Sequence, residues 1–536
     1  MKSRSHVHFA ENNFKVEFED PLNPSTSTPE YKNKFQPKRS SKLTLFIVLA
    51  CAVLILNLIL YAPTSSSRFN RISDISSIKP PLPSVPPAFP RATSQHSPNN
   101  SLNNSPNNVH LIFSTDCGLF QTWQSYALFH RALVIHQPGH ITRIASGCES
   151  AEQQQMQTWH DDFISPMSPN FHVHFTPKFD GTSEDGKSGK TYSFFNKPYG
   201  LLHWLENNHI HEDVIVVLLD PDNFLLKPIV NDFSDTSSNL VSHPRAWSEG
   251  KGEVPTRVSH GTPFGQKYGL GSGWKKFNLH KITSDPGSPA ISLSAKVSFI
   301  FLAPLPSSPL LANPPPARPP ARQDANTFYP VGPPYLFTAR DALKIAKKWV
   351  EFVRPVNEEY PHLLGEMYAY CIAAAHLNLP HVMLDSLMVS NVGAHEGWKF
   401  VDDLDKQEIC APNTVAHNEG ALPNVLHFCQ MYRMGEFAFH KRKIPRDIFT
   451  CEHPLMEAPP ANLVSSGEFN YKTQGDKSGA KRGNLVLTST ESVRNGFLIC
   501  NLVQIINEAA IYFKEQHCVN GEKINFEKTW NHHKLE

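Results

Sequence analysis

Residues 214–229 read VIVVLLDPDNFLLKPI, and this stretch decides the class of the fold. Its first six residues, 214–219, are all apolar and do not alternate with polar residues. A continuous apolar run rich in β-branched side chains indicates a strand that is buried on both faces, as in the centre of a parallel sheet. Asp220 and Asp222 follow this strand directly. Ligands of open α/β sheets bind outside the carboxyl ends of the strands, so two carboxylates stand where a ligand is expected.

Strand-like and helix-like segments alternate on both sides of this stretch. This order of strand, helix, strand, helix and strand predicts an α/β domain with a doubly wound sheet. The pattern contains no internal repeat. The predicted elements are strands at 109–113 and 142–144 and helices at 123–135, 199–206, 339–353, 363–377 and 502–516.

The composition of the chain limits its class. Its 536 residues are 40% hydrophobic, which is enough to form a sizeable core and excludes a wholly disordered chain. Proline is in excess, with 45 residues, and this surplus belongs in linkers because proline interrupts helices and sheet ladders. The 50 basic residues nearly balance the 49 acidic ones, so no global field attracts nucleic acid, and nucleic acid is not expected as a partner.

A membrane anchor is predicted at 43–62, a run of twenty residues without a charged side chain. This length spans a bilayer core as a helix, and the 42 residues before it make a cleaved signal peptide the poorer interpretation. A buried core helix is the alternative interpretation. Five basic residues lie between 32 and 42, so the positive-inside rule predicts a cytoplasmic tail at 1–42 and a lumenal remainder, as in a single-pass type II membrane protein.

Residues 63–108 are rich in proline, serine and asparagine and are expected to form a flexible stem. The stem carries two glycosylation sequons, Asn99-Asn100-Ser101 and Asn103-Asn104-Ser105. A short tail, an anchor, a stem and a large lumenal body form the layout of enzymes resident in the Golgi. We therefore expect a Golgi membrane location, with the endoplasmic reticulum as the alternative.

The lumenal part is expected to contain a domain at 109–460 and a C-terminal segment at 461–536 whose helix packs on that domain. The domain is interrupted at 284–322 by a proline-rich stretch, which is either a surface insertion or an error in the gene product. Eight cysteines follow the anchor, an even number that suits disulfides in an oxidising compartment, although the sequence leaves their pairing open. No cysteine or histidine spacing indicates a structural zinc site.

Asp220 and Asp222 are the strongest chemical signal in the chain. Two carboxylates at i and i+2 can converge on one hard divalent cation, which prefers oxygen ligands and shares them with phosphates. The alternative is an ordinary turn, since aspartate and proline are common turn residues. In a membrane-anchored lumenal α/β domain, such a motif is typical of glycosyltransferases that use nucleotide sugars. The ion then neutralises the diphosphate leaving group.

Further candidates lie elsewhere in the chain. Glu366 and Tyr370 are four residues apart on a predicted helix and share one face, so they could meet a sugar or an acceptor together. The alternative is an ordinary helix end with Glu366 in solvent. His427 could complete the metal shell, although a lone histidine is more often structural. Three residues are candidates for contacts with a diphosphate: Arg143, Asn196 and Lys197.

Several ordered blocks of the sequence resemble one family. They are VHLIFSTDCGLFQTWQ, GHITRIASG, FNKPYGLLHWLE, VIVVLLDPDNFLLKPI, YPVGPPYLFTARDALKIAKKW, GEMYAYCIAAAHLNL, LPNVLHFCQMY and GEFAFHKRKIP. On these residues the chain resembles the plant and algal peptidyl glycosyltransferases that decorate hydroxyproline-rich proteins. These are the hydroxyproline O-arabinosyltransferases and the peptidyl serine α-galactosyltransferases. The resemblance covers about 109–284 and 325–514.

The resemblance implies a GT-A-like, Rossmann-type glycosyltransferase domain, a UDP-sugar donor, and transfer to protein hydroxyls with retention of configuration. It implies a divalent ion, Mn²⁺ by preference, held by Asp220 and Asp222 with His427 as third ligand. Glu366 falls in a segment near the expected active site, and we take Glu366 and Tyr370 as the catalytic candidates. The first strand and its loop would hold the nucleotide through Ser114, Thr115 and Asp116.

The resemblance leaves the sugar open. FSTDCGLFQTWQ, GHITR and NKPYGLLHWL are nearer the serine galactosyltransferases, whereas GEFAFHKR and the helix around INEA (506–509) are nearer the arabinosyltransferases. The acceptor is accordingly expected to be a protein rich in hydroxyproline or serine. Two other classes compete with this interpretation. One is a noncatalytic lumenal binding or scaffold protein that kept the fold, and the other, more remote, is a hydrolase with two carboxylates as acid and base.

Overall fold

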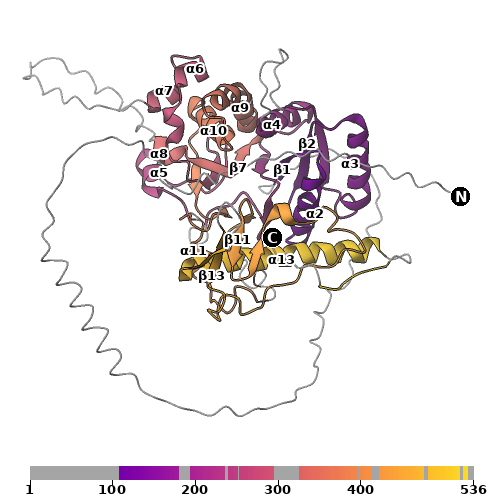
Figure 1. Ribbon diagram of the computed structural model, residues 1–536. Helices are drawn as coiled ribbons and strands as arrows, with labels where there is room; N and C mark the ends of the chain where they lie inside the picture. Colours follow the sequence, from indigo (N-terminus) through magenta and orange to yellow (C-terminus); the bar gives the residue numbers. More distant parts are fainter. Residues whose placement is uncertain are drawn as a thin grey trace, which may run out of the picture. The chain divides into compact units, whose positions relative to one another are not determined.

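A seven-stranded mixed sheet organises the protein, with the strand order β3-β2-β1-β4-β7-β6-β8 (Figure 1). The computed structural model describes residues 108–179, 193–235, 240–251, 253–294, 325–395, 397–411, 414, 422–475, 481–518 and 523–528. The predicted tail, anchor and stem lie outside these residues. The strands of the sheet are β1 (Val109–Asp116), β2 (His140–Ser146), β3 (Phe171–Thr176), β4 (Ile215–Leu219), β6 (Phe264–Lys267), β7 (Val331–Thr338) and β8 (Val382–Leu384).

The α/β class predicted from the sequence is confirmed, but the sheet is not wholly parallel. Strands β3, β2, β1 and β4 are parallel, whereas β7 runs antiparallel to both β4 and β6. β7 was not predicted, because it contains Pro333 and Pro334, which argue against a central strand. The register between β6 and β7 jumps from Tyr335 to Gly332, so both prolines fall in a bulge and β7 keeps its place in the sheet.

Helices cover both faces of the sheet. Side chains alternate along β1, so that Phe113 contacts Phe129 of α2 (Leu119–Val134) while His110 contacts Trp204 of α4 (Asn196–Asn207). α2 and α4 therefore lie on opposite faces. Four more long helices pack around these two. α3 (Ser150–Phe163) lies beside α2, and α13 (Ser489–His517) also packs against α2. α9 (Ala339–Glu359) lies beside α4, and α10 (Gly365–His376) packs against α9.

Smaller elements complete the described part of the chain. The short helices are η1 (Ser193–Phe195), α5 (Pro244–Lys251), η2 (Gly273–Lys276), α6 (Leu279–Thr283), α7 (Pro289–Ser294), α8 (Ala325–Phe328), α11 (Lys399–Asp402) and η4 (Lys441–Lys443). The remaining strands are β5 (Asn223–Leu225), β9 (Met388–Val389) and β10 (Val425–His427), which form a small sheet, and the pairs β11 (Tyr432–Met434) with β12 (Phe437–Phe439) and β13 (Tyr471–Gly475) with β14 (Lys481–Val486).

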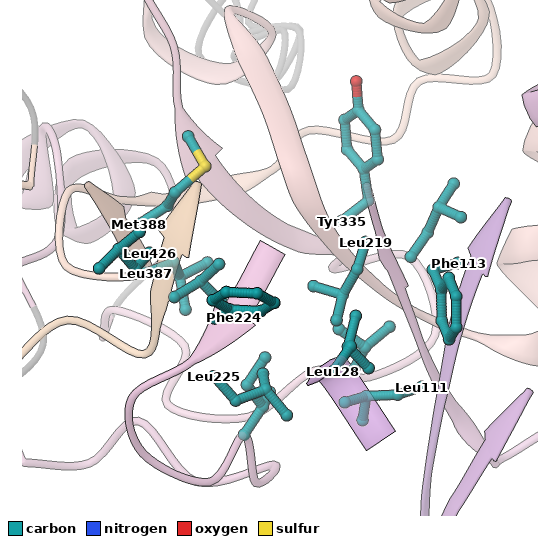
Figure 2. Packing of buried hydrophobic residues seen from close by; sticks show 14 of the residues in the cluster. Leu111, Phe113, Leu128, Leu219, Phe224, Leu225, Tyr335, Leu387, Met388 and Leu426 are labelled. Carbon is teal, nitrogen blue, oxygen red and sulfur yellow. The ribbon is translucent and has the colours of Figure 1, made fainter. Parts of the chain in front are cut away.

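One hydrophobic core joins the large sheet to the small one. Figure 2 shows Leu219 of β4 and Phe113 of β1 in the same packed region as Phe224 of β5 and Leu426 of β10. All four side chains are fully buried. Because this core is continuous, the turn between β4 and β5, which carries the two aspartates, is held rigidly from both sides.

α13 contains the predicted helix 502–516 and is longer than expected. Among the described helices it alone is long and apolar enough to cross a membrane, and 72% of its most apolar window is buried inside the protein. Disulfides Cys410–Cys500 and Cys451–Cys518 fasten this helix to the preceding segments. Its apolar composition is thus accounted for by the core that it packs against.

The cysteines pair only in part. A third disulfide, Cys117–Cys148, joins the ends of β1 and β2, while Cys371 and Cys429 are free thiols. Six of the eight cysteines after the predicted anchor therefore form disulfides, as the even number suggested, and two do not.

The proline-rich insertion begins later than the predicted residue 284. Helix α7 packs against α10, and Ser288 forms a hydrogen bond of 2.8 Å with His376. Ala290 is fully buried. Residues 284–294 are therefore part of the fold, and residues 295–324 lie outside the described part of the chain.

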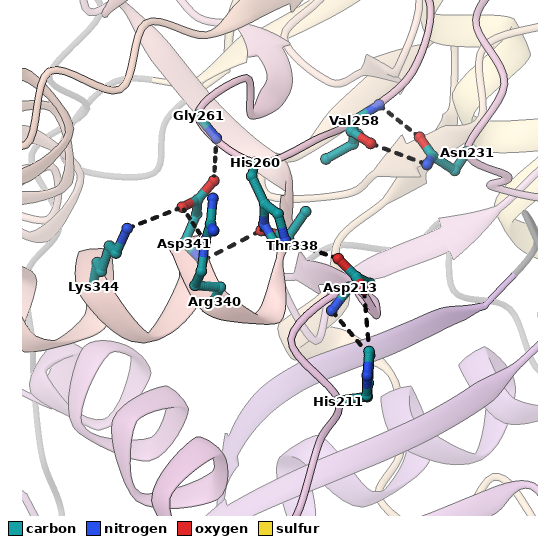
Figure 3. A network of polar contacts seen from close by, with 10 residues as sticks. All are labelled: His211, Asp213, Asn231, Val258, His260, Gly261, Thr338, Arg340, Asp341 and Lys344. Atoms are coloured by element: carbon teal, nitrogen blue, oxygen red, sulfur yellow. Dashed lines mark hydrogen bonds and ion pairs between the residues drawn. The ribbon is translucent and has the colours of Figure 1, made fainter. Parts of the chain in front are cut away.

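A buried carboxylate at the amino end of β4 is structural. Asp341, in the first turn of α9, accepts a hydrogen bond of 2.6 Å from the backbone N–H of Gly261 (Figure 3). In the same network His260 bonds to Thr338 and contacts Asp213 (Figure 3). The network ties the start of α9 to the loop before β6, at the opposite end of β4 from Asp220.

Five imidazoles gather on the sheet face that α4 covers. His140 pairs with His172 at 3.0 Å, and His174 pairs with His203 at 2.9 Å. Burial, together with His140 and His172, lowers the pKa of His110 to about 3, and burial with His203 lowers that of His174 to about 4. Burial also lowers the pKa values of His140 and His172.

We expect these histidines to make stability fall steeply in acid. A base with a depressed pKa binds fewer protons in the folded than in the unfolded chain, so the free energy of unfolding decreases as the pH falls below about 6.5. The slope should approach about 1.4 kcal/mol per pH unit for each such histidine. Thermal unfolding between pH 7.5 and 5 measures it. His110→Gln should flatten the slope, whereas the exposed control His209→Gln should leave it unchanged; equal slopes for both variants would contradict this prediction.

Candidate metal centre

The two aspartates leave β4 at the carboxyl edge of the sheet. β1 and β4 are parallel with Phe113 opposite Leu219, so Ser114, near the end of β1, lies beside Asp220, the first residue after β4. The chain then turns into β5, where the Asp220 backbone N–H donates to the Asn223 side chain at 3.1 Å. This turn fixes the direction of both carboxylates.

His427 reaches the aspartates through the small sheet. β10 is antiparallel to β5 with His427 opposite Asn223, and the Phe428 backbone N–H donates to the Asp222 carbonyl at 3.0 Å. A residue distant in sequence is thereby placed beside the acidic turn. Potential ligand atoms of Asp220, Asp222 and His427 all lie within 4.8 Å of one another.

The donor set fits a divalent cation. His427 Nε2 is 3.4 Å from Asp222 Oδ1, while its Nδ1 is buried without a hydrogen-bond partner among the described residues, so Nε2 is the nitrogen that faces the carboxylates. Two carboxylates and one imidazole suit Mn²⁺ and similar ions, and leave coordination positions for a substrate. Asp220 is partly exposed, which gives the group an open side.

Lys197 and Glu366 adjoin the same group. The Lys197 ammonium, in the first turn of α4, lies 2.7 Å from Asp220 Oδ1 and 2.7 Å from Glu366 Oε1. Burial opposes the charge of Lys197, but the two carboxylates outweigh it and raise the pKa of Lys197. Burial raises the pKa of Glu366, and the charge of Asp220 adds to this, although Lys197 acts in the other direction. Lys197 therefore keeps two nearby carboxylates from repelling each other.

Lys441 forms an ion pair with Asp222 from the other side. Lys441 belongs to η4, directly after β12, and its ammonium contacts Asp222 Oδ2. Burial alone would raise the pKa of Asp222, but Lys441 and His427 hold it well below its usual range. Three carboxylates thus face two ammonium groups. A divalent ion would change the net charge of this cluster from negative to positive, as a diphosphate ligand requires.

Two further side chains lie near the cluster. Tyr268 is partly buried, and its pKa is raised by desolvation first, then by Cys429, and also by the charges of Asp220 and Asp222. The Cys429 thiol lies 3.1 Å from Ser390 Oγ, and burial together with Asp222 raises its pKa to about 11. Cys429 is therefore a neutral thiol near neutral pH, not a nucleophile.

Of the predicted nucleotide contacts, Lys197 alone touches the acidic cluster among the described residues. Arg143 is fully buried under Trp159, on the sheet face opposite α4, and donates a hydrogen bond to Thr115 Oγ1 at 2.9 Å. Burial lowers the pKa of Arg143 to about 10, against the effect of Asp116. The Asp116 carboxylate is engaged with the Gly118 backbone N–H at 2.8 Å. The hydrogen bond between Arg143 of β2 and Thr115 of β1 holds the ends of these two strands together.

The other predicted contacts are placed as follows. Ser114 lies near the end of β1, beside Asp220, and is buried. Asn196 accepts a hydrogen bond of 3.2 Å from the Phe179 backbone N–H, which anchors the start of α4. Asn196 thus supports the position of Lys197, the next residue.

Glu366 and Tyr370 do not meet, although both lie on α10. The Tyr370 hydroxyl bonds to His381 at 2.8 Å, and its ring stacks on Tyr335 with centroids 3.8 Å apart. Glu366 instead turns to Lys197. The expectation that the two residues act together is wrong, because Tyr370 packs in the core whereas Glu366 belongs to the acidic cluster.

Sequence reasoning missed Lys441 as a member of the cluster. Its signal was present in the block GEFAFHKRKIP, which ends a hairpin shortly after the predicted ligand His427. Asn223 was also missed, although its position after the acidic pair is typical of a side chain that closes a turn.

The known proteins with which this chain is compared below are glycosyltransferases. No protein-family model matches the chain. The chain is 23% identical over 359 residues to the peptidyl serine alpha-galactosyltransferase of Arabidopsis thaliana, which covers 66% of this chain and 34% of that protein. It is 29% identical over 125 residues to the protein of the same name from Chlamydomonas reinhardtii, covering 22% and 14%. The chain thus spans about a third of the length of the first of these relatives.

Two solved structures align with part of the chain. The bifunctional glycosyltransferase WbbM aligns over 62% of this chain and 47% of its own, with 11% identity and a TM-score of 0.30. The galactosyltransferase LgtC, in complex with donor and acceptor sugar analogs, aligns over 60% of this chain and 87% of its own, with 9% identity and a TM-score of 0.29.

Proposed function

We propose that this protein is a metal-dependent glycosyltransferase of the GT-A-like type, which transfers a sugar from a UDP-sugar to a hydroxyl group of a protein. One observation carries the proposal: two aspartates at the carboxyl edge of the sheet converge with His427, and two lysines flank them. The names of the two curated relatives support it.

Each residue of the cluster has a separate role in the proposed reaction. Asp220, Asp222 and His427 would hold a divalent ion, Mn²⁺ by preference, which neutralises the charge that develops on a diphosphate leaving group. Lys197 orients the Asp220 carboxylate, and Glu366 fixes Lys197. Lys441 supplies a second positive charge on the diphosphate side. Ser114, beside Asp220 at the carboxyl edge of the sheet, is a further proposed nucleotide contact.

The substrates follow from the relatives and the retained sequence blocks. The names of the relatives favour galactose as the sugar and serine as the acceptor, while arabinose and hydroxyproline are the alternative pair. We propose transfer with retention of configuration. We also propose a type II orientation in the Golgi membrane, with the helix at 43–62 as the anchor and the sheet domain in the lumen.

A donor screen tests the proposal. The full chain in detergent, with Mn²⁺, would be offered a panel of UDP-sugars with serine-rich and hydroxyproline-rich peptides, and UDP release and peptide mass would be followed. We expect release and a matching mass increase with one sugar, most of all UDP-galactose, and loss of both on chelation. A folded sample that binds UDP but transfers no sugar would instead favour the noncatalytic class.

A further inference from the structure

The two oxygens of the Asp222 carboxylate have different neighbours. Oδ1 faces His427 Nε2 at 3.4 Å, on the side of the proposed ligand set. Oδ2 contacts the Lys441 ammonium. A divalent ion bound at Oδ1 would therefore share one carboxylate with an ammonium group, and two cations at that separation repel each other strongly in a partly buried site.

Lys441 is mounted so that its ammonium can move while its backbone stays in place. The η4 turn is held by the Lys443 backbone N–H, which donates to His440 at 2.9 Å, and by Ile444, which is buried. The Lys441 side chain is 22% exposed and has four rotatable methylene groups. Its head group can swing by several ångströms without disturbing the turn.

Lys197 differs in this respect. Its side chain is 12% exposed, and its ammonium is shared between two carboxylates at 2.7 Å. Moving it would leave Asp220 and Glu366 facing each other, so Lys197 is a fixed part of the cluster. Among the described residues, Lys441 forms an ion pair with one carboxylate, that of Asp222.

On this geometry, and resting on the proposed function, we propose that Lys441 competes with the divalent ion for Asp222 and that a nucleotide diphosphate relieves this competition by drawing the Lys441 ammonium onto its own oxygens. The ion then binds weakly alone and tightly together with the diphosphate. Because such coupling is reciprocal, the diphosphate also binds more tightly when the ion is present. Lys441 thus acts as a positioning residue that links the two binding events.

Binding measurements on the full chain test this inference without any turnover. Mn²⁺ affinity would be measured by electron paramagnetic resonance, with and without saturating UDP, for the wild type, Lys441→Met, Lys441→Arg and Lys443→Met. Lys443 is exposed and lies in the same turn, which makes it a matched control. We expect Lys441→Met to bind Mn²⁺ about tenfold more tightly in the absence of UDP, since a repelling cation is removed. UDP should then improve its Mn²⁺ affinity less than in the wild type. The other two variants should behave like the wild type.

The outcomes separate this inference from the proposed function. If Lys441→Met binds Mn²⁺ no more tightly than the wild type while Asp222→Asn abolishes binding, the metal centre stands and the competition is overturned. If the wild type binds no Mn²⁺ even with saturating UDP, or Asp222→Asn binds it equally well, the metal centre itself is overturned, and the inference with it. Thermal unfolding of each variant shows that affinities are compared between folded proteins.

Discussion

Replacing Asp222 with asparagine is expected to lower the rate of sugar transfer by about a thousandfold or more. The substitution keeps the shape of the side chain but removes the charge that faces both His427 and Lys441. Loss of a bound ion removes several kcal/mol of stabilisation of the leaving group, and about 4 kcal/mol corresponds to a thousandfold. Transfer would be followed with the donor found in the screen, and Mn²⁺ binding would be measured on the same samples.

The control for this variant is Asp232→Asn. Asp232 is an exposed aspartate that pairs with Arg257 at 3.1 Å. We expect its removal to leave transfer within about twofold, because exposed pairs contribute little. The thermal midpoint of Asp222→Asn should stay within a few degrees of the wild type, since the Lys441 ammonium can turn to solvent. A folded Asp222→Asn protein with more than a tenth of the wild-type rate would show that the carboxylate does not hold an essential ion.

Replacing Lys197 with methionine is expected to reduce the free energy of unfolding by about 3 kcal/mol at neutral pH. The ammonium bridges two carboxylates, and its removal takes away the positive charge between Asp220 and Glu366, whose side chain is 4% exposed. Breaking a buried ion pair on one side costs about 3–5 kcal/mol. Burial and Asp220 already raise the pKa of Glu366, and the loss of Lys197 would raise it further. Chemical denaturation measures the change.

The pH dependence of this variant has a defined sign. An acid whose folded pKa is raised binds more protons in the folded than in the unfolded chain, so the deficit should shrink as the pH falls toward the pKa of Glu366 and that group becomes neutral. The double variant Lys197→Met with Glu366→Gln should recover most of the loss at neutral pH. Lys281→Met removes an exposed lysine 3.2 Å from Glu358 and should cost less than about 1 kcal/mol. Equal losses for the two lysines would contradict the bridging role.

The local elements were readable from the sequence because their patterns are local. The strand β4 is a continuous apolar run, β1 is mostly apolar up to Phe113, and the helix α9 repeats its apolar residues with helical spacing. The order of these elements predicted the α/β class. The strand β7 was not predicted because Pro333 and Pro334 are unfavourable in a central strand. Only the pairing of β7 with β4 and β6 compensates for them.

The site was predicted in part. Asp220 and Asp222 stand out because both follow one buried strand, and His427 was suggested by the family resemblance. Tyr370 was assigned from its helical spacing to Glu366, but spacing gives only a shared face and does not say which neighbour each side chain meets. Arg143 was assigned from its charge, although it is buried under Trp159 on the other face of the sheet.

The sequence by itself determined the class of the fold, the acidic turn after β4 and the type of chemistry that two such carboxylates permit. Hydrophobic periodicity and turn residues act over a few positions, so a short stretch of sequence is enough to determine these features. Only the tertiary structure decided which cations meet those carboxylates. Lys197 pairs with Asp220 and with Glu366, and Lys441 pairs with Asp222. These residues come from three separate elements, α4, α10 and η4, and only the packing of the core brings their charges together at that edge of the sheet, where a buried charge needs a counter-charge.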